Sequence, residues 1–218
     1  MQQLRRIFVA LIIISPLTAQ ADLIDAVDQG WWNAVDNSNN TNTGANTFSG
    51  LNGIVLGSDL FRSYFVFDLT GIGPVGAGST LILNELMYFS SDASETFNIF
   101  DVLTDTNTLR TAGTNAGTYS DLGSGNNYGS FTVDAGDQGT NVIVNLTAAA
   151  IADINANLGG FFAIGIASQT ISGLANDGIR FDGTPHQLDV VSVPEPGTLA
   201  LFGIGLLGMG AARRRKKA

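Results

Sequence analysis

The stretch FRSYFVFDL, residues 61–69, is the most distinctive part of the body of this chain and decides its fold. Successive side chains of an extended strand point to opposite faces. One face would carry Phe61, Ser63, Phe65, Phe67 and Leu69, and the other would carry Arg62, Tyr64, Val66 and Asp68. A nearly continuous apolar run of this length predicts a central strand of a sheet.

Further strand-like segments lie on either side of this one, separated by turns rich in Gly, Ser and Asp. Residues 22–35 are predicted as the first strand or two, at a sheet edge. TLILNELMYF (residues 80–89) and ETFNIFDVL (residues 95–103) are predicted as the next two strands. Later strands are expected at residues 128–133, 140–146, 161–167 and 187–191. Strands of this length between such turns predict an antiparallel β-sandwich.

One segment of the body has the pattern of a helix. Ile151, Ile154 and Leu158 fall along one helical face, Thr147 is suited to cap its start, and the glycines at 159–160 end it. Residues 36–50 and 108–128 are rich in Asn, Thr and Gly and are predicted as loops, with weak strands as an alternative for the second. The predicted fold class is therefore all-β: an antiparallel β-sandwich with one short helix.

The segment RSYFVFDL (residues 62–69), followed by STLIL at residues 79–83, resembles the core strands of jelly-roll-type surface modules of bacteria. Such modules carry an FVFDL strand, then a short Gly/Pro connection, and then a strand like ATLRL. The resemblance extends over residues 30–191 and implies a jelly-roll-like sandwich. The chain departs from the pattern in its polar segment 36–50 and in Asn84 and Glu85, so the resemblance implies a fold but no ligand.

Residues 1–21 have the three parts of a secretory signal peptide. Arg5 and Arg6 precede an apolar region at residues 7–14, and the triplet with Ala19 and Ala21 at its ends follows Pro16 as a cleavage site for signal peptidase. An N-terminal membrane anchor is the alternative, but the apolar region is short for one. The predicted organisation is a signal peptide at 1–21, a β-sandwich passenger domain at 22–192 and a sorting segment at 193–218.

The C-terminal segment also has three parts. Pro194, Glu195 and Pro196 form an extended element, because two prolines this close cannot lie inside a helix. Residues 198–212 carry no charge and predict a short transmembrane helix, which at about 1.5 Å per residue spans roughly 22 Å of a hydrocarbon core about 30 Å thick. A basic anchor follows: Arg213, Arg214, Arg215, Lys216 and Lys217. Such cations favour the cytoplasmic side of the membrane, and their long side chains can extend a short span.

This order of parts resembles the PEP-CTERM sorting signal of Gram-negative bacteria, with Pro194, Glu195 and Pro196 as its signature. The resemblance implies an exosortase substrate: a membrane-embedded, transpeptidase-like cysteine enzyme cuts near the motif. It also implies export through the secretion machinery, an inner-membrane-anchored precursor, and a mature form at the cell surface or outside the cell. A plain C-terminal anchor is the alternative. The Leu-Pro-x-Thr-Gly signal of Gram-positive sortases is absent.

The body of the chain is strongly acidic. Residues 22–192 contain three basic and 18 acidic residues, a net charge of −15. Such a surface repels phosphate backbones, which argues against nucleic-acid binding. The chain has no cysteine, so disulfides and a cysteine nucleophile are excluded. Solubility is the favoured role of the acid excess, and binding of divalent cations is the alternative. We therefore expect no cofactor, with calcium as a weak candidate.

The candidate binding residues in the body are aromatic. Trp31 and Trp32 are adjacent in a predicted strand, where they would face opposite sides. One of the two rings would then be available to stack on a sugar, although packing of both is the favoured interpretation. Tyr119 and Tyr128 are further candidate platforms.

Candidate catalytic and metal-binding residues are scarce. His186 is the single histidine and has no sequence context for a zinc site or a hydrolase triad. Asp134 and Asp137 lie in a connector that is predicted as a turn, with a calcium loop as the less favoured alternative. No catalytic residue and no metal ligand is assigned, and we expect a protein that is not an enzyme.

Together these features predict an exported, exosortase-processed protein of the surface or extracellular matrix, associated with exopolysaccharide, biofilm or floc. The alternative is a carbohydrate-binding module presented at the cell surface.

Overall fold

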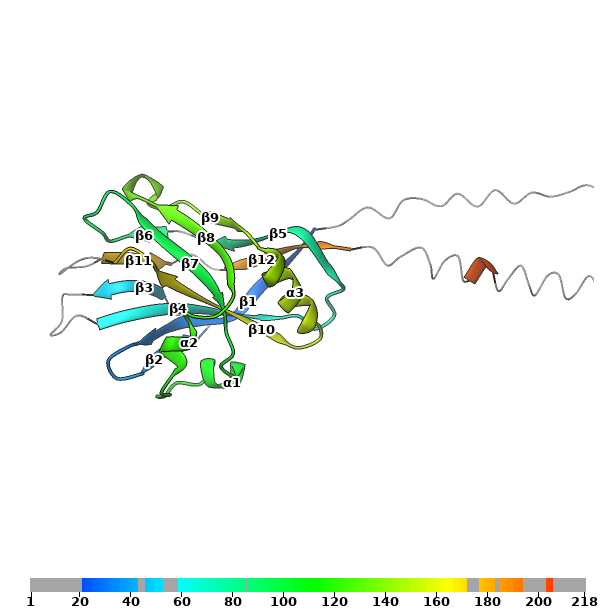
Figure 1. Ribbon diagram of the computed structural model, residues 1–218, viewed down its shortest axis with the longest axis horizontal. Coiled ribbons are helices and arrows are strands. Elements are labelled where there is room, and N and C mark those ends of the chain that lie inside the picture. Colours follow the sequence, from blue (N-terminus) through cyan, green and yellow to red (C-terminus); the bar gives the residue numbers. More distant parts are fainter. Residues whose placement is uncertain are drawn as a thin grey trace, which may run out of the picture. The chain divides into compact units, whose positions relative to one another are not determined.

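The computed structural model describes residues 21–42, 46–52, 59–84, 86–171, 177–182, 185–193 and 203–205. The described residues from Ala21 to Val193 belong to one of the two compact units of the chain. In this part of the chain every strand pairing is antiparallel, and the strands form two sheets that share β1 (Ala21–Asn33) (Figure 1).

The smaller sheet, sheet A, contains the first half of β1. This half pairs with β12 (Gln187–Ser192), which pairs with β5 (Val75–Leu83), which pairs with β9 (Val142–Asn145). Strand β12 is therefore held on both sides, even though it is the last strand of the unit.

The larger sheet, sheet B, is built around β4 (Asp59–Asp68), the strand that FRSYFVFDL predicts. One side of β4 pairs with the second half of β1, which also pairs with β2 (Asn39–Asn42). Strand β4 also pairs with two branches of the sheet. The first branch is β10 (Phe161–Ser168), β7 (Glu95–Asp101) and β8 (Asn127–Val133), and the second is β3 (Thr47–Asn52), β11 (Asp177–Phe181) and β6 (Leu86–Tyr88).

The alternation predicted for β4 is confirmed. Phe65, Phe67 and Leu69 belong to the main core, whereas Tyr64 and Val66 lie in a second cluster on the opposite face. The main core also contains Leu81 and Leu188 of sheet A, so it lies between the two sheets. Burial of one large apolar side chain contributes roughly 1.5–3 kcal/mol, and the pairing of two apolar faces is what makes this strand central.

The second cluster covers the outer face of sheet B. The sequence pattern did not predict it. The segment at 108–128 is neither a plain loop nor a set of weak strands. It contains two single-turn helices, α1 (Thr106–Leu109) and α2 (Thr118–Asp121), which lie by β10 and β1 (Figure 1). Buried side chains on the sheet and next to these helices form the cluster: Trp32, Tyr64, Val66, Leu109, Leu122 and Ala163.

Two further expectations about elements are wrong. The polar segment 36–50 contains β2 and the start of β3 rather than only a loop. The segment 80–89 is not one strand, because β5 ends at Leu83 in sheet A and β6 starts at Leu86 in sheet B. Asn84 lies at this change of sheet, where its backbone N–H donates to Nδ1 of His186 at 3.0 Å.

The predicted helix is confirmed as α3 (Ala148–Ala156), with Thr147 as its N-cap. The expectation of one helix is incomplete, since α1, α2 and the short 3-10 helix η1 (Ala135–Asp137) are also present. Among the described residues, none of the helices has the length and apolar character needed to cross a membrane. Of the predicted transmembrane segment 198–212, only 203–205 are described.

Candidate functional site

The folded unit begins and ends in neighbouring strands. Ala21 is opposite Val191, and Oγ of Ser192 donates to the carboxylate of Asp22 at 2.8 Å. The backbone N–H of Val193 donates to the carbonyl of Pro74 at 2.8 Å. The chain is therefore fastened to the sandwich up to Val193, the residue before the Pro-Glu-Pro element.

Most residues of the predicted sorting and processing sites lie outside the described part of the chain. This applies to Pro194, Glu195 and Pro196, to Ala19, and to the basic anchor at 213–217. Ala21 is described, and it is the first residue of β1.

The two tryptophans differ in exposure. Trp32 has only 1% of its surface exposed and packs in the cluster on the outer face of sheet B, so its ring is not a platform for a sugar. Trp31 is partly exposed, and its ring meets that of Phe61 edge-on at 4.9 Å between centroids. The expectation that the pair faces opposite sides holds, and only Trp31 keeps a candidate stacking role.

Trp31 starts a row of partly exposed rings that runs across strands of sheet B. Phe61 contacts Phe48 at 5.5 Å between centroids, and Phe48 contacts Phe89 at 6.3 Å. The guanidinium of Arg180 lies 5.3 Å from the centre of the Phe89 ring. We call Trp31, Phe61, Phe48 and Phe89 the aromatic row. Three of its four members come from segments in which the sequence indicated no site.

The candidate tyrosines do not serve as platforms. Tyr128 is 2% exposed and its hydroxyl donates to Oδ2 of Asp153 at 2.6 Å. Tyr119 is partly buried against the second cluster, and the guanidinium of Arg62 lies 4.3 Å from the centre of its ring. Both rings therefore stabilise the segments that pack on sheet B.

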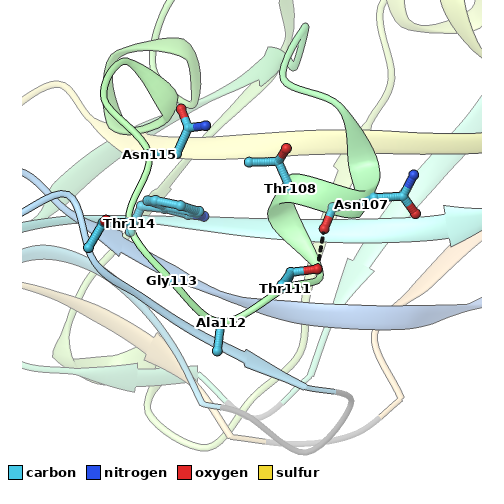
Figure 2. A pocket seen from close by; sticks show the side chains of 8 residues that line it. Asn107, Thr108, Thr111, Ala112, Gly113, Thr114 and Asn115 are labelled. Atoms are coloured by element: carbon cyan, nitrogen blue, oxygen red, sulfur yellow. Dashed lines mark hydrogen bonds between the residues drawn. The ribbon is translucent and has the colours of Figure 1, made fainter.

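A pocket of about 370 Å³ is lined by Trp32, by α1 and by the segment that follows α1. Figure 2 shows its polar lining, in which Asn107 and Thr108 come from α1 and residues 111–115 from the segment beyond it. The hydroxyl of Thr111 donates to the carbonyl of Asn107 at 2.7 Å, which fixes this wall. The indole N–H of Trp32 is buried and has no hydrogen-bond partner among the residues that the structure describes.

Three carboxylates meet at one point of sheet B. Asp92, Glu95 and Asp177 each bring an oxygen within 4.8 Å of the others, and Glu95 and Asp177 are buried. Oε1 of Glu95 accepts a hydrogen bond from Ser90 at 2.8 Å, and Oε2 accepts one from Thr170. Burial, followed by the neighbouring Asp177, raises the pKa of Glu95. The arrangement suits either a retained proton or a hard cation.

The turn at Asp134 and Asp137 is confirmed as a turn. The Asp134 carboxylate accepts from the backbone of Gly136 at 2.6 Å, and the Asp137 carboxylate accepts from the backbone of Asp134 at 2.9 Å. Both carboxylates thus cap η1.

His186 is fully buried and lies edge-on to Phe65, with ring centroids 4.9 Å apart. Burial lowers its pKa to about 4. The side chain is therefore neutral at pH 7 and acts as a core residue that accepts from Asn84.

Comparison with known proteins bears on the C-terminal end of the chain. The family model of the PEP-CTERM protein-sorting motif matches residues 192–216. No curated protein matches the chain. The structure and this match define a class of protein: an antiparallel β-sandwich passenger with a C-terminal sorting motif. More particularly, the matching motif is the PEP-CTERM sorting motif, which implies exosortase as the processing partner, export, and a membrane-anchored precursor.

Proposed function

We propose that the chain is a non-enzymatic protein of the cell surface or extracellular matrix, freed from its anchor by exosortase, that contributes to an exopolysaccharide-associated layer such as biofilm or floc. The observation that carries the proposal is the sorting motif at 192–216, which starts where β12 ends. An acidic sandwich without disulfides is suited to this role, because its net charge keeps it soluble while its core holds the fold.

The test is the intact mass of the protein recovered from its host, measured for each cell fraction. We expect a product that starts at Asp22, ends near residues 194–196 and is found outside the membrane fraction. Glu195→Ala should leave an uncut precursor in the membrane, because the motif then lacks its charged residue. Asp59→Ala is the matched control, since it removes one carboxylate outside the motif. If the wild-type protein is found in the membrane with residues 213–218 still attached, the tail is a plain anchor and the proposed processing by exosortase is wrong.

A carbohydrate-binding module at the cell surface is the second candidate function. The aromatic row favours it, because exposed rings pack against the C–H faces of sugars and Trp31 is the largest ring of the row. A polysaccharide pull-down with the full-length protein in mild detergent tests it. Trp31→Ala should weaken the retention, and Trp32→Ala should instead lower the stability of the fold.

A further inference from the structure

A second cleft, apart from the aromatic row, lies where β7 ends, β8 and β10 begin and α3 comes to its end. Its volume is about 440 Å³, within the range of small-ligand sites. We call it the aspartate cleft. Its lining combines carboxylates, amides, hydroxyls and aromatic rings, and it includes Asp101, Asp105, Asp153, Asn157 and Phe161.

The carboxylates of the aspartate cleft are held in place by the fold. Asp101 accepts from the backbone N–H of Asn126 at 2.7 Å, and Asp153 accepts from the hydroxyl of Tyr128 at 2.6 Å. Asp105 caps α1 by accepting from the backbone N–H of Asn107 at 3.0 Å. Fixed acceptors of this kind lose little entropy when they bind a ligand.

The cleft also offers an apolar surface. Phe161 is 38% exposed, although it begins a strand of the sheet. The guanidinium of Arg110 lies 4.8 Å from the centre of its ring, and this contact orients the ring. A ligand in the cleft would thus meet an aromatic ring next to several hydrogen-bond acceptors.

The geometry is poor for a metal ion. In the part of the chain that the structure describes, the single set of three acidic groups whose oxygens converge is Asp92, Glu95 and Asp177, which does not line this cleft. A calcium ion needs six to eight oxygens at about 2.3–2.6 Å. The spread of the cleft's acids favours a ligand that takes hydrogen bonds over a distance of several ångströms.

The charge of the cleft selects among such ligands. Burial first, and then Asp153 and Asp121, raise the pKa of Asp101, so these carboxylates repel one another. An acidic ligand such as a uronate or a sulfated sugar would add to this repulsion. Hydroxyl groups donate hydrogen bonds to carboxylates without that penalty.

We infer that the aspartate cleft binds an uncharged saccharide, with the sugar hydroxyls donating to Asp101, Asp105 and Asp153 and a C–H face of the ring packed on Phe161. The inference rests on the second proposed function, to which it adds a ligand class and a binding site separate from the aromatic row. It does not depend on cleavage by exosortase.

The test is a titration of full-length protein, in mild detergent, with neutral gluco- and galacto-oligosaccharides and with uronate oligosaccharides. We expect the wild type to bind a neutral oligosaccharide and to bind uronates at least about tenfold more weakly. Asp153→Asn keeps an acceptor for Tyr128 but removes the charge, and it should weaken binding about tenfold. Phe161→Ala should have a similar effect.

The controls separate this site from its rivals. Asp59→Asn, a matched change outside the cleft, and Trp31→Ala, a change in the aromatic row, should leave the affinity of the cleft for these oligosaccharides unchanged. Asp105→Ser removes a charge while keeping a residue that caps helices, so it serves if Asp153→Asn fails to fold. Loss of binding in Trp31→Ala alone would overturn the cleft and keep the second proposed function. Absence of binding to every neutral oligosaccharide at millimolar concentration would overturn the cleft, and absence of polysaccharide retention as well would overturn the second proposed function. Equal binding of uronates would mean that the charge of the cleft does not select its ligand.

Discussion

His186 shows how burial of one side chain sets a pH dependence. Its pKa is about 4 in the folded protein and near 6.5 in an unfolded chain. Between these two pKa values, His186 binds a proton in the unfolded state but not in the folded state. The stabilisation is fully present above pH 6.5 and is lost as the pH falls toward 4. The full effect is roughly 3 kcal/mol, since one pKa unit corresponds to about 1.4 kcal/mol.

His186→Asn should flatten this dependence, because Asn does not titrate and its amide oxygen can accept from the backbone of Asn84. The measurement is urea unfolding of both proteins at several pH values between 4 and 7. His186 is the one histidine of the chain, so no other histidine contributes to the difference. Equal slopes of unfolding free energy against pH for the two proteins would contradict the prediction.

Glu95 makes the stability of the fold depend on pH in the opposite direction. Its folded pKa is raised, chiefly by burial, so the folded state holds a proton more tightly than the unfolded state. The corresponding stabilisation is fully present below the unfolded pKa of about 4.3 and is lost as the pH rises through the folded pKa. In Glu95→Gln, the amide oxygen can accept from one of the Ser90 and Thr170 hydroxyls and the amide N–H can donate to the other. This variant should lose less stability than the wild type between pH 4 and 7.

A chelator distinguishes a retained proton from a bound cation at the same three carboxylates. We expect EDTA to leave the melting temperature of the wild type unchanged at pH 7, because the hydroxyls of Ser90 and Thr170 already donate to the carboxylate of Glu95. A drop in the wild type that is absent in Glu95→Gln would assign a divalent cation to Asp92, Glu95 and Asp177.

At the scale of elements, the close approach of β10 and the end of α2 holds the outer cluster together. A Cβ added at Gly165 would lie 2.4 Å from the carbonyl oxygen of Leu122, so the two backbones touch only because this residue is glycine. Gly165→Ala should lift α2 from the sheet and destabilise the fold by about 1–3 kcal/mol.

Thermal unfolding of Gly165→Ala and of Gly73→Ala tests this contact. A Cβ at Gly73 has no neighbour within 4 Å, so that variant controls for the substitution itself. If both variants melt at the wild-type temperature, α2 is not seated on β10 in the way described.

For the whole molecule, the position of β12 predicts where the folded unit ends. This strand lies between β1 and β5, so its removal opens sheet A and takes Leu188 and Val190 out of the main core. A chain that stops at Val193 should keep the cooperative thermal transition of the full-length protein. A chain that stops at His186 should lose it, as recorded by circular dichroism. Retention of the transition in the shorter chain would mean that sheet A does not need its last strand.

The sequence alone determined the features that depend on local pattern or on the order of the chain. The alternation of residues 61–69 placed Phe65 and Tyr64 on opposite faces, and the cap and apolar spacing identified α3. The sorting motif was readable because it is one continuous segment, residues 192–216, which needs no partner from elsewhere in the chain.

The remaining features of the fold and of the candidate sites could be found only in the tertiary structure, because residues distant in sequence form them. The burial of Trp32 depends on α1 and α2 packing over β1, and the change of sheet at Asn84 depends on the buried ring of His186. The aspartate cleft depends on strand pairing that brings Asp101 and Phe161 together with α3. Long-range pairing of this kind leaves no periodic signal in the segments that it joins. The positions of the aspartates in the sequence therefore did not predict a site, which becomes visible only in the folded sheets.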